Sequence, residues 1–449
     1  MPPATTIPPA DLTSLALLAP PTDGIPNGNA VYVDTPWSDR FALRTEGLTS
    51  SMIRELLKYT QDPEMISFAG GMPAPQVFPL VEIEAACHKV LAEQGSLALQ
   101  YSATEGYLPL RELLVRHMER YGIRVTPANV LITSGSQQAL DLIGKLLINP
   151  GDRVLVEAPT YLGALQAFNS YEARYLTVPI DGEGMRVVEL EEELRSGPKF
   201  LYVLPNFHNP SGTTLPLARR NRLVELANRY GVPIVEDDPY GQLRYEGEHQ
   251  SPLVEIDSEY HGERLGRAAA GGPFRGGVIY LSSLSKTLAP GLRVAWVVAP
   301  TDVIARLVQI KQSADLHTST FSQMVAYETA RGGFLDQHVR VLCDFYRLRL
   351  TAMCDALAKY MPDGVEWTQP QGGLFLWLTL PQGDIEKLGA TAILQEAVKA
   401  KVVFVPGAAF YPGKGGERSM RLNFSYCTPE VIEVGIRRLS EVVARALAG

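Results

Sequence analysis

The chain has 449 residues, of which 46% are hydrophobic and 20% are charged, and its formal net charge is −8. This composition is typical of a globular protein with two or three domains, and the negative charge argues against a nucleic-acid partner, which usually requires a basic surface. No apolar run approaches the roughly 18 residues of a membrane-spanning helix, so we expect no membrane segment.

Residues 1–40 are rich in proline and small side chains, and they predict a flexible N-terminal arm. No lysine or arginine occurs before Arg40, so we expect no signal peptide. The cysteines show neither C-x-x-C nor Cys/His spacing, which predicts reduced thiols in a cytoplasmic protein and no metal site. They are Cys87, Cys343, Cys354 and Cys427.

Residues 41–66 predict an N-terminal helix that forms part of a small domain. Within "TSSMIRELLKYTQ", an apolar helical face is formed by Met52, Ile53, Leu56 and Leu57. Arg54 lies on the opposite face, so its spacing alone favours an arginine in contact with solvent.

From about residue 125 to residue 300, short β-branched runs alternate with amphipathic segments. The predicted strands are "NVLIT", "RVLVEA", "KFLYVLP", "VPIVED", "GVIYLSS" and "RVAWVVA". Helical patterns lie between them, for example "QQALDLIGKLL" and "LARRNRLVELANRYG", the second closed by Gly231 as its C-cap. Because the strands are almost continuously apolar, we predict an α/β fold with a mostly parallel sheet that helices cover on both faces.

The pattern changes past about residue 335. The sequence there predicts a long helix, "LDQHVRVLCDFYRLRLTAMCDALAKYM", strands in "GLFLWLTLP" and "KVVFVPG", and a closing helix from Pro429. We therefore expect a large domain over residues 67–334 and a smaller C-terminal α+β domain over residues 335–449. The polar, glycine-rich stretch 246–277 is interpreted as a surface loop with some local structure.

Groups that suit one binding site follow five consecutive predicted strands. In open α/β sheets, ligands bind outside the carboxyl ends of the strands. After "NVLIT" comes "SGSQQAL", a helix start that can hold an anion, although a serine N-cap explains it equally well. The next four strands are followed by Tyr161, by Asn209, by Asp237 with Tyr240, and by Lys286.

Each of these residues also has an ordinary structural interpretation, as a core tyrosine, an Asn-Pro turn, an acidic turn or a surface lysine. A pyridoxal 5′-phosphate (PLP) site requires an amine, an anion cradle, a carboxylate, donors to the ring oxygen and an aromatic face. The five strand ends supply all of them, so we predict a PLP site. The sequence argues against two other kinds of phosphate-binding site. "GAAFYPGKGG" does not have the residue spacing of a P-loop, and no G-x-G-x-x-G motif of a dinucleotide site follows a predicted strand.

At this level of detail the chain resembles the fold-type I PLP-dependent aminotransferases, and within them the 2-aminoadipate/kynurenine group. The resemblance covers about residues 40–445. It is carried by "SFAGGMPAPQVFP", "LQYSATEGYLPLRE", "SGSQQALDL", "EAPTY", "PNFHNPSGTT", "VEDDPYGQLRY", "SSLSKTLAPGLRVAW" and "RLNFSY". The large domain would then bind PLP. One departure is His208, where many relatives have glutamine, and we expect little effect from it.

The resemblance implies a role for each site residue. Lys286 would form the Schiff base with PLP and carry the proton, and Asp237 would pair with the pyridine nitrogen. Asn209 and Tyr240 would donate to the ring hydroxyl, while Tyr161 would stack on the ring. The phosphate would be held by Ser136, Gln137, Ser283, Ser285 and Arg293.

The resemblance also implies how substrate binds. Arg421 would bind the substrate α-carboxylate beside Asn209 and Gly71. Tyr101 would arrive from the partner subunit of a homodimer with shared active sites. Arg54 would meet a distal carboxylate, because the N-terminal helix covers the substrate pocket in relatives.

The predicted function is transfer of an amino group from an L-amino acid (2-aminoadipate, glutamate, leucine or an aromatic) to a 2-oxo acid such as 2-oxoglutarate, by a ping-pong mechanism. The alternatives are a PLP-dependent lyase or decarboxylase, because one fold carries several chemistries, and an aminotransferase-like domain of a transcription regulator. The regulator would require a basic winged-helix domain ahead of residue 40, and we expect none from the arm.

Overall fold

The computed structural model describes residues 37–46, 48, 52–264, 274–383 and 389–448. The chain divides into two compact units, Met1–Ala42 and Leu43–Gly449. The predicted arm lies almost entirely outside the described residues, and in the first unit only a short 3-10 turn at Trp37–Arg40 is described. The rest of the fold concerns the second unit. Within the described part of the chain, every helix is too short or too polar to cross a membrane.

The centre of the second unit is an eight-stranded sheet with the order β2-β9-β8-β7-β6-β3-β4-β5. The five strands from β8 to β4 in this order run parallel, while β9 is antiparallel to both neighbours and β5 is antiparallel to β4. The strands span Val130–Thr133 (β2), Arg153–Ala158 (β3), Arg174–Asp181 (β4), Gly184–Met185 (β5), Leu201–Val203 (β6), Ile234–Asp237 (β7), Val278–Ser283 (β8) and Ala295–Val298 (β9).

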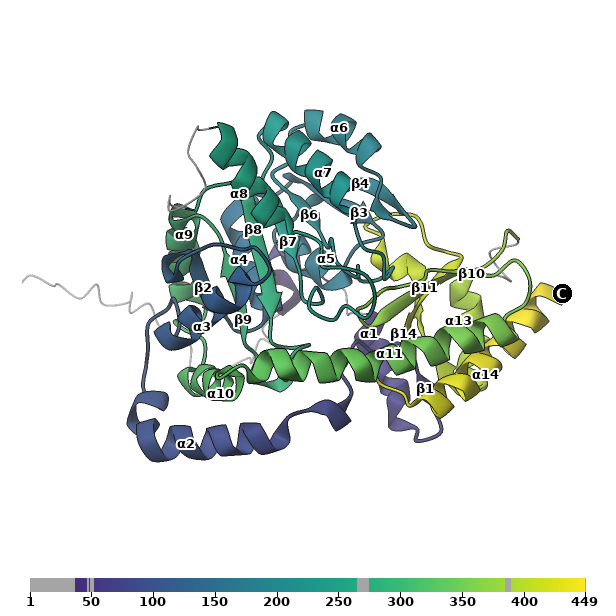
Figure 1. Cartoon of the computed structure of the whole chain (residues 1–449). Helices are drawn as coiled ribbons and strands as arrows, with labels where there is room; N and C mark the ends of the chain where they lie inside the picture. The colour runs from purple at the N-terminus through teal and green to yellow at the C-terminus, as the bar shows by residue number, and fades with distance from the viewer. Residues whose placement is uncertain (1–36, 47, 49–51, 265–273, 384–388, 449) are drawn as a thin grey trace, which may run out of the picture. The chain divides into compact units, whose positions relative to one another are not determined.

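Helices cover both faces of this sheet (Figure 1). Successive strand side chains point to opposite faces, so Val154 and Val156 join one apolar cluster and Leu155 joins the other. The first cluster includes residues of α4 (Ser136–Leu147), α5 (Leu162–Asn169) and α9 (Thr301–Ala314). The second includes residues of α3 (Leu108–Glu119), α6 (Val187–Arg195), α7 (Leu217–Tyr230), α8 (Leu253–Arg264) and α10 (Thr320–Ala330). The predicted α/β class with a mostly parallel sheet is confirmed.

All six predicted strands are present, and two further strands, β4 and β5, were not predicted. β4 is only partly buried, since one of its two neighbours in the sheet is the two-residue strand β5. The sequence of β4 therefore lacks the continuous apolar run that is typical of a central strand. Within the stretch 246–277, the local structure is the helix α8, whose first residues, Leu253 and Val254, are buried, while residues 265–273 lie outside the described residues. Gly231 ends α7 in the left-handed conformation, as predicted.

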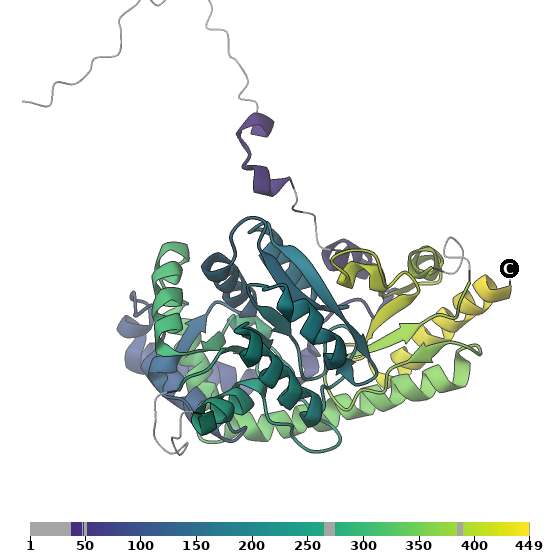
Figure 2. The same cartoon turned by 90° about the horizontal axis from the view of Figure 1, so that it is seen from above.

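The C-terminal part of the chain forms a second layered structure. Its antiparallel sheet contains β10 (Glu366–Trp367), β11 (Phe375–Thr379), β14 (Ser419–Asn423) and β13 (Val405–Pro406), in that order. The long helix α11 (Phe334–Tyr360) packs along α14 (Pro429–Ala448), and both are seen side by side in Figures 1 and 2. The remaining α-helices among the described residues are α1 (Met52–Leu57), α2 (Leu80–Ala98) and α13 (Ala390–Lys399).

Residues from the two ends of the second unit come together in this layer. β1 (Ile66–Ser67) pairs in parallel with β12 (Val402–Val403), and Phe68 lies in the same apolar cluster as residues of α14. This pairing places Gly71, a few residues after β1, beside the C-terminal sheet. The domain boundaries at residues 66/67 and 334/335 stay predictions.

Candidate active site

A cavity of about 300 Å³ lies at the carboxyl ends of β3, β6, β7 and β8. Of the predicted site residues whose side chains are described, all except Tyr101 line it. The residues that line the cavity are Gly71, Ser136, Gln137, Tyr161, Leu204, Asn209, Asp237, Pro239, Tyr240, Ser283, Ser285, Lys286, Pro290, Arg293, Phe375 and Arg421. The fold therefore brings together side chains from strand ends that are far apart in sequence.

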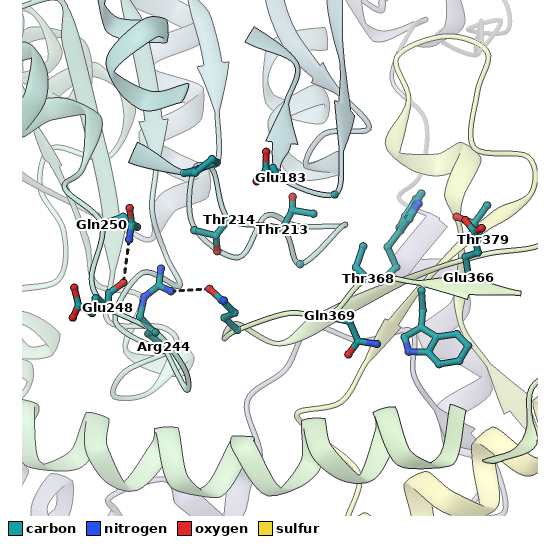
Figure 3. Close-up of a pocket in the computed structure, with 17 residues that line it drawn as sticks. Glu183, Thr213, Thr214, Arg244, Glu248, Gln250, Glu366, Thr368, Gln369 and Thr379 are labelled. Carbon is teal, nitrogen blue, oxygen red and sulfur yellow. Dashed lines mark hydrogen bonds between the residues drawn. The ribbon is translucent and has the colours of Figure 1, made fainter. Parts of the chain in front are cut away.

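A larger cavity of about 690 Å³ lies elsewhere in the same unit (Figure 3). Its labelled side chains include Glu183, Glu248 and Glu366, with Arg244 as the basic residue, and Arg244 donates to the side chain of Gln371. Its described lining contains no lysine and none of the strand-end residues predicted for the site. The chemistry therefore points to the smaller cavity.

The amine of Lys286 faces the smaller cavity from the loop after β8. Its Nζ donates to the backbone oxygen of Gly71 at 2.7 Å. Burial lowers the pKa of Lys286 to about 8, and the nearby charges of Arg421 and Arg293 act in the same direction. A neutral, nucleophilic amine is therefore accessible near neutral pH.

The carboxylate of Asp237 ends β7 and is buried. Tyr202, on β6, donates to its Oδ2 at 2.8 Å, while its Oδ1 is buried without a hydrogen-bond partner. Burial raises the pKa of Asp237 to about 7, the bond from Tyr202 opposes this rise, and the neighbouring Asp238 adds to it. Since a buried polar atom without a partner is costly, the free oxygen indicates a missing donor in the cavity.

An anion cradle lies where α4 begins. Gly135 precedes the helix with a φ of +87°, and a Cβ at this position would collide with the guanidinium of Arg293. The next residue, Ser136, is the first residue of α4. The unpaired backbone N–H groups of the first turn and the dipole of the helix therefore favour the binding of an anion. Ser283 and Ser285 join the cradle from the end of β8, where their hydroxyls are 2.8 Å apart.

Arg421 lies on β14 with 1% of its surface exposed. It donates to Asn209 Oδ1 at 2.9 Å and to the Ala69 backbone oxygen at 2.6 Å, and its Nε is buried without a partner. Its guanidinium carbon is 4.2 Å from the centre of the Phe375 ring. Burial lowers the pKa of Arg421 to about 10, so it stays charged near pH 7.

Two tyrosines complete the walls of the cavity. Tyr161 follows β3, and a Cβ at Gly163 would meet its ring, so the glycine leaves room for the aromatic side chain. Gln137 donates to the backbone oxygen of the same Gly163 at 2.8 Å, which ties the cradle to this wall. Tyr240 is buried edge-on to Phe375, and burial raises its pKa well above the usual value.

Two predicted site residues remain. Tyr101 is 77% exposed and is outside the cavity of its own chain, with its ring edge-on to His317. Arg54 belongs to α1, and its side chain lies outside the described residues. The roles predicted for both stay predictions.

The sequence did not indicate several residues of the site. Tyr202 lies within a continuous apolar strand, where a buried tyrosine cannot be distinguished from any other core residue. Phe375 and Leu204 line the cavity, but each also lies in an apolar run. Only the alternation along β6 could have suggested that Tyr202 and Leu204 share a face.

The cavity fits PLP by its own chemistry. An amine, an unpaired carboxylate oxygen and an anion cradle that a Cβ would fill lie together in it, and these are the groups that an aldehyde, a pyridine nitrogen and a phosphate require. The fold and the site thus define a PLP-dependent enzyme of fold-type I.

Comparison with known proteins gives the family. The family model of aminotransferase class I and II matches residues 71–439, and the chain belongs to this family. The sequence-based prediction of a PLP-dependent aminotransferase is therefore confirmed.

Named relatives align over most of their length. Aromatic-amino-acid aminotransferase 1 of Thermococcus litoralis is 46% identical over 410 residues, covering 90% of this chain and 94% of the relative. A 2-aminoadipate transaminase of Thermus thermophilus is 45% identical over 414 residues, covering 92% of this chain and 98% of the relative. A crystal structure of LysN, an α-aminoadipate aminotransferase from Thermus thermophilus complexed with N-(5′-phosphopyridoxyl)-L-leucine, matches with a TM-score of 0.82 at 42% identity, covering 92% of this chain and 100% of that chain.

Proposed function

We propose that the enzyme transfers the amino group of 2-aminoadipate, glutamate, leucine or an aromatic L-amino acid to a 2-oxo acid such as 2-oxoglutarate. The observation that carries the proposal is the meeting of Lys286, the unpaired oxygen of Asp237 and the buried Arg421 in one cavity. When bound, PLP supplies an aldehyde for the amine and a ring that accepts electrons from the substrate Cα.

The cofactor would be held at both ends of the ring. Asp237 Oδ1 is the free acceptor that suits a protonated pyridine nitrogen, because Oδ2 is already bonded to Tyr202. Asn209 and Tyr240 would donate to the ring hydroxyl, and Tyr161 would cover the ring face. The phosphate would bind Ser136, Gln137, Ser283, Ser285 and Arg293.

Lys286 would carry the proton of the reaction. Its pKa of about 8 lies close to neutral pH, so both the neutral amine that can accept a proton and the ammonium that can return one are accessible. Burial is the main cause of this pKa, and the arginines in the same cavity strengthen the effect.

Arg421 would bind the substrate α-carboxylate. The bonds to Asn209 and to the Ala69 oxygen fix the guanidinium plane, and the unpartnered Nε leaves a donor for the substrate. A charged donor in a buried site binds a carboxylate more strongly than it does in water. Gly71 has no side chain to obstruct this approach.

The substrate range is proposed from the relatives and from Arg54. Relatives of similar identity are named for aromatic amino acids and for 2-aminoadipate, which suggests that one pocket accepts both acidic and aromatic side chains. Arg54 would pair with the distal carboxylate of an acidic substrate and move away for an apolar one.

The second half-reaction would use the same cavity for the acceptor, which gives ping-pong kinetics. The active unit would be a homodimer in which Tyr101 enters the partner's site. The exposure of Tyr101, outside the cavity of its own chain, supports this arrangement. A cytoplasmic location also remains a prediction.

Two measurements test the proposal. Borohydride reduction of the holoenzyme should attach the cofactor to the peptide that contains Lys286, and attachment to any other lysine would contradict the site. A panel of amino donors with 2-oxoglutarate should produce glutamate and the matching 2-oxo acid. Release of carbon dioxide or of a side-chain fragment without glutamate would instead indicate a decarboxylase or a lyase.

A further inference from the structure

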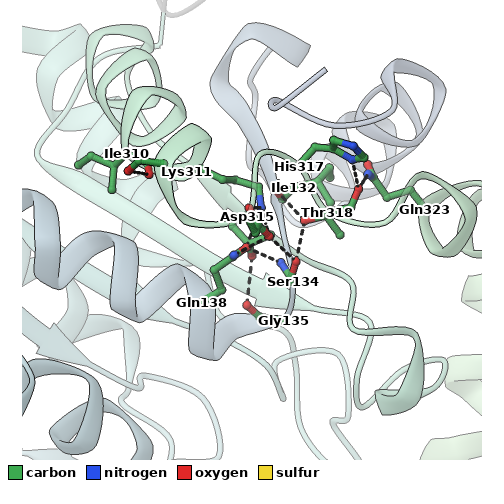
Figure 4. A network of polar contacts seen from close by, with 12 residues as sticks. Ile132, Ser134, Gly135, Gln138, Ile310, Lys311, Asp315, His317, Thr318 and Gln323 are labelled. Atoms are coloured by element: carbon green, nitrogen blue, oxygen red, sulfur yellow. Dashed lines mark hydrogen bonds and ion pairs between the residues drawn. The ribbon is translucent and has the colours of Figure 1, made fainter. Parts of the chain in front are cut away.

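An ion pair between the buried Lys311 and Asp315, whose side chain is 27% exposed, lies beside the start of α4 (Figure 4). Lys311, on α9, has no exposed surface, and its Nζ donates to Asp315 Oδ1 at 2.7 Å and to Gln138 Oε1 at 2.7 Å. A lysine is rarely buried without such partners, because the ammonium loses its hydration. Burial opposes the ionisation of Asp315, but the hydrogen bonds from Lys311, Gln138 and Ser134 lower its pKa, so this carboxylate is charged near pH 7. Burial lowers the pKa of Lys311, and its contact with Asp315 opposes this shift.

The pair holds the start of α4 through Gln138 and Ser134. Gln138 Oε1 accepts from the backbone N–H of Ser134 at 2.8 Å, while its Nε2 donates to Asp315 Oδ2 at 2.6 Å. The hydroxyl of Ser134 donates to the same oxygen of Asp315 at 2.9 Å. The backbone nitrogen and the hydroxyl oxygen of Ser134 are thus both held by the same hydrogen-bond network.

Ser134 connects this network to the cavity. Its backbone oxygen accepts from Arg293 at 3.4 Å, and the next residue is Gly135, whose left-handed backbone leads into α4. Ser136 and Gln137 follow and line the cavity. A shift of Ser134 would therefore move the backbone N–H groups that form the cradle.

We propose that Lys311 and Asp315 are positioning residues for the phosphate of the cofactor, acting through Gln138 and Ser134 on the first turn of α4. The inference rests on the proposed function, since it takes the phosphate to bind at this turn. Neither residue lines the cavity, so both act through the turn that they hold.

A purely structural role is the competing explanation. The same network also holds the loop after α9, because the hydroxyls of Ser134 and Thr318 are 3.1 Å apart and Gln323 donates to the Thr318 backbone oxygen at 2.8 Å. Loss of the ion pair could therefore loosen this region in general. A ligand without a phosphate separates the two explanations.

The test compares PLP with pyridoxal, which has the same ring and aldehyde but no phosphate. The dissociation constants of both are measured for the apoenzymes of the wild type and Lys311→Met by absorbance and fluorescence titration. We expect roughly 10- to 150-fold weaker binding of PLP, the range of one charge-assisted hydrogen bond, and binding of pyridoxal within about 2-fold of the wild type. Inorganic phosphate should also raise the melting temperature of the variant apoenzyme less than that of the wild type.

A matched control is available on the same pair of helices. Lys145 donates to Ser313 Oγ at 3.4 Å and lies in the last turn of α4, at the opposite end of the helix from the cradle. Lys145→Met should leave the binding of PLP unchanged. If Lys311→Met does not fold, the double variant Lys311→Met/Asp315→Asn, which removes both charges, is measured in the same way.

Equal weakening of PLP and pyridoxal, or unchanged binding of both, would overturn the inference. It would leave the proposed function intact as long as the wild type still binds PLP at Lys286. A wild type that fails the borohydride test would remove the proposed function itself, so the two failures are distinguishable.

Discussion

The pKa of Lys286 predicts how the apoenzyme captures an aldehyde as the pH changes. Burial disfavours the ammonium form, so the folded-state pKa is about 8 in place of the usual value of 10.5. At pH 7, a pKa of 8 leaves roughly 9% of the amine neutral, whereas 10.5 would leave roughly 0.03%. The free amine is therefore about 300-fold more abundant at neutral pH than in a solvated lysine.

Trace acetylation measures the neutral fraction of the Lys286 amine directly. The apoenzyme is treated with a small amount of acetic anhydride between about pH 6 and pH 11, and the labelling of the Lys286 peptide is quantified by mass spectrometry relative to an exposed lysine, Lys399. Half-maximal labelling is expected near pH 8. Because the charge of Arg421 also lowers the pKa of Lys286, Arg421→Met should move this midpoint upward.

The same shift affects stability in a defined direction. Between about pH 8 and pH 10.5 the unfolded lysine keeps its proton and the folded one has lost it, so this residue makes the apoenzyme more stable as the pH rises through that window. A labelling midpoint near 10.5 would refute the reasoning, since it would mean that Lys286 is solvated and that burial does not prepare the amine.

Four further outcomes are expected. Asp237→Ala should lower kcat by roughly 100- to 1000-fold with a much smaller change in KM, because it removes a charge that matters most in the transition state; near-normal steady-state turnover would show that another group holds the ring nitrogen. Tyr202→Phe removes a bond that lowers the pKa of Asp237, so the acid limb of the kcat–pH profile should move to higher pH, and an unmoved limb would contradict this role. Mixed dimers of Lys286→Ala and an inactivating Tyr101 variant should regain part of the activity, and verified heterodimers that stay inactive would exclude shared sites. Arg54→Ala should cost roughly 10- to 150-fold in kcat/KM for 2-aminoadipate and glutamate but little for leucine and phenylalanine, whereas an equal loss for all four would mean that the residue supports the fold.

Much of the large sheet could be predicted because its signals are local. Central parallel strands are buried on both faces, and their side chains are apolar whatever the strand order is. β4 was missed for the same reason, since its partial burial removes that signal. The pattern could not show that β9 runs antiparallel between β8 and β2, because strand direction depends on connections and not on composition.

The site residues were accessible to sequence reasoning because strand ends carry function. In a parallel sheet the carboxyl ends meet at one edge, so the residues after β3, β6, β7 and β8 had to be neighbours once the fold class was known. Their roles required the resemblance, since Tyr161 or Lys286 alone has an ordinary structural explanation. The N-terminal Gly71 and the C-terminal Arg421 lie on the other layer, and no local pattern relates them to this edge.

The sequence by itself determined which side chains are available at the cavity: a lysine, a carboxylate, a helix start and an arginine. Only the tertiary structure decided their chemical state. The pKa of Lys286 is lowered because the folded chain buries it near Arg421, and one oxygen of Asp237 is free because Tyr202, from a different strand, bonds the other. Such effects depend on distances of a few ångströms between residues that are far apart in the chain. These distances cannot be read from the amino-acid sequence, because only folding brings the residues together.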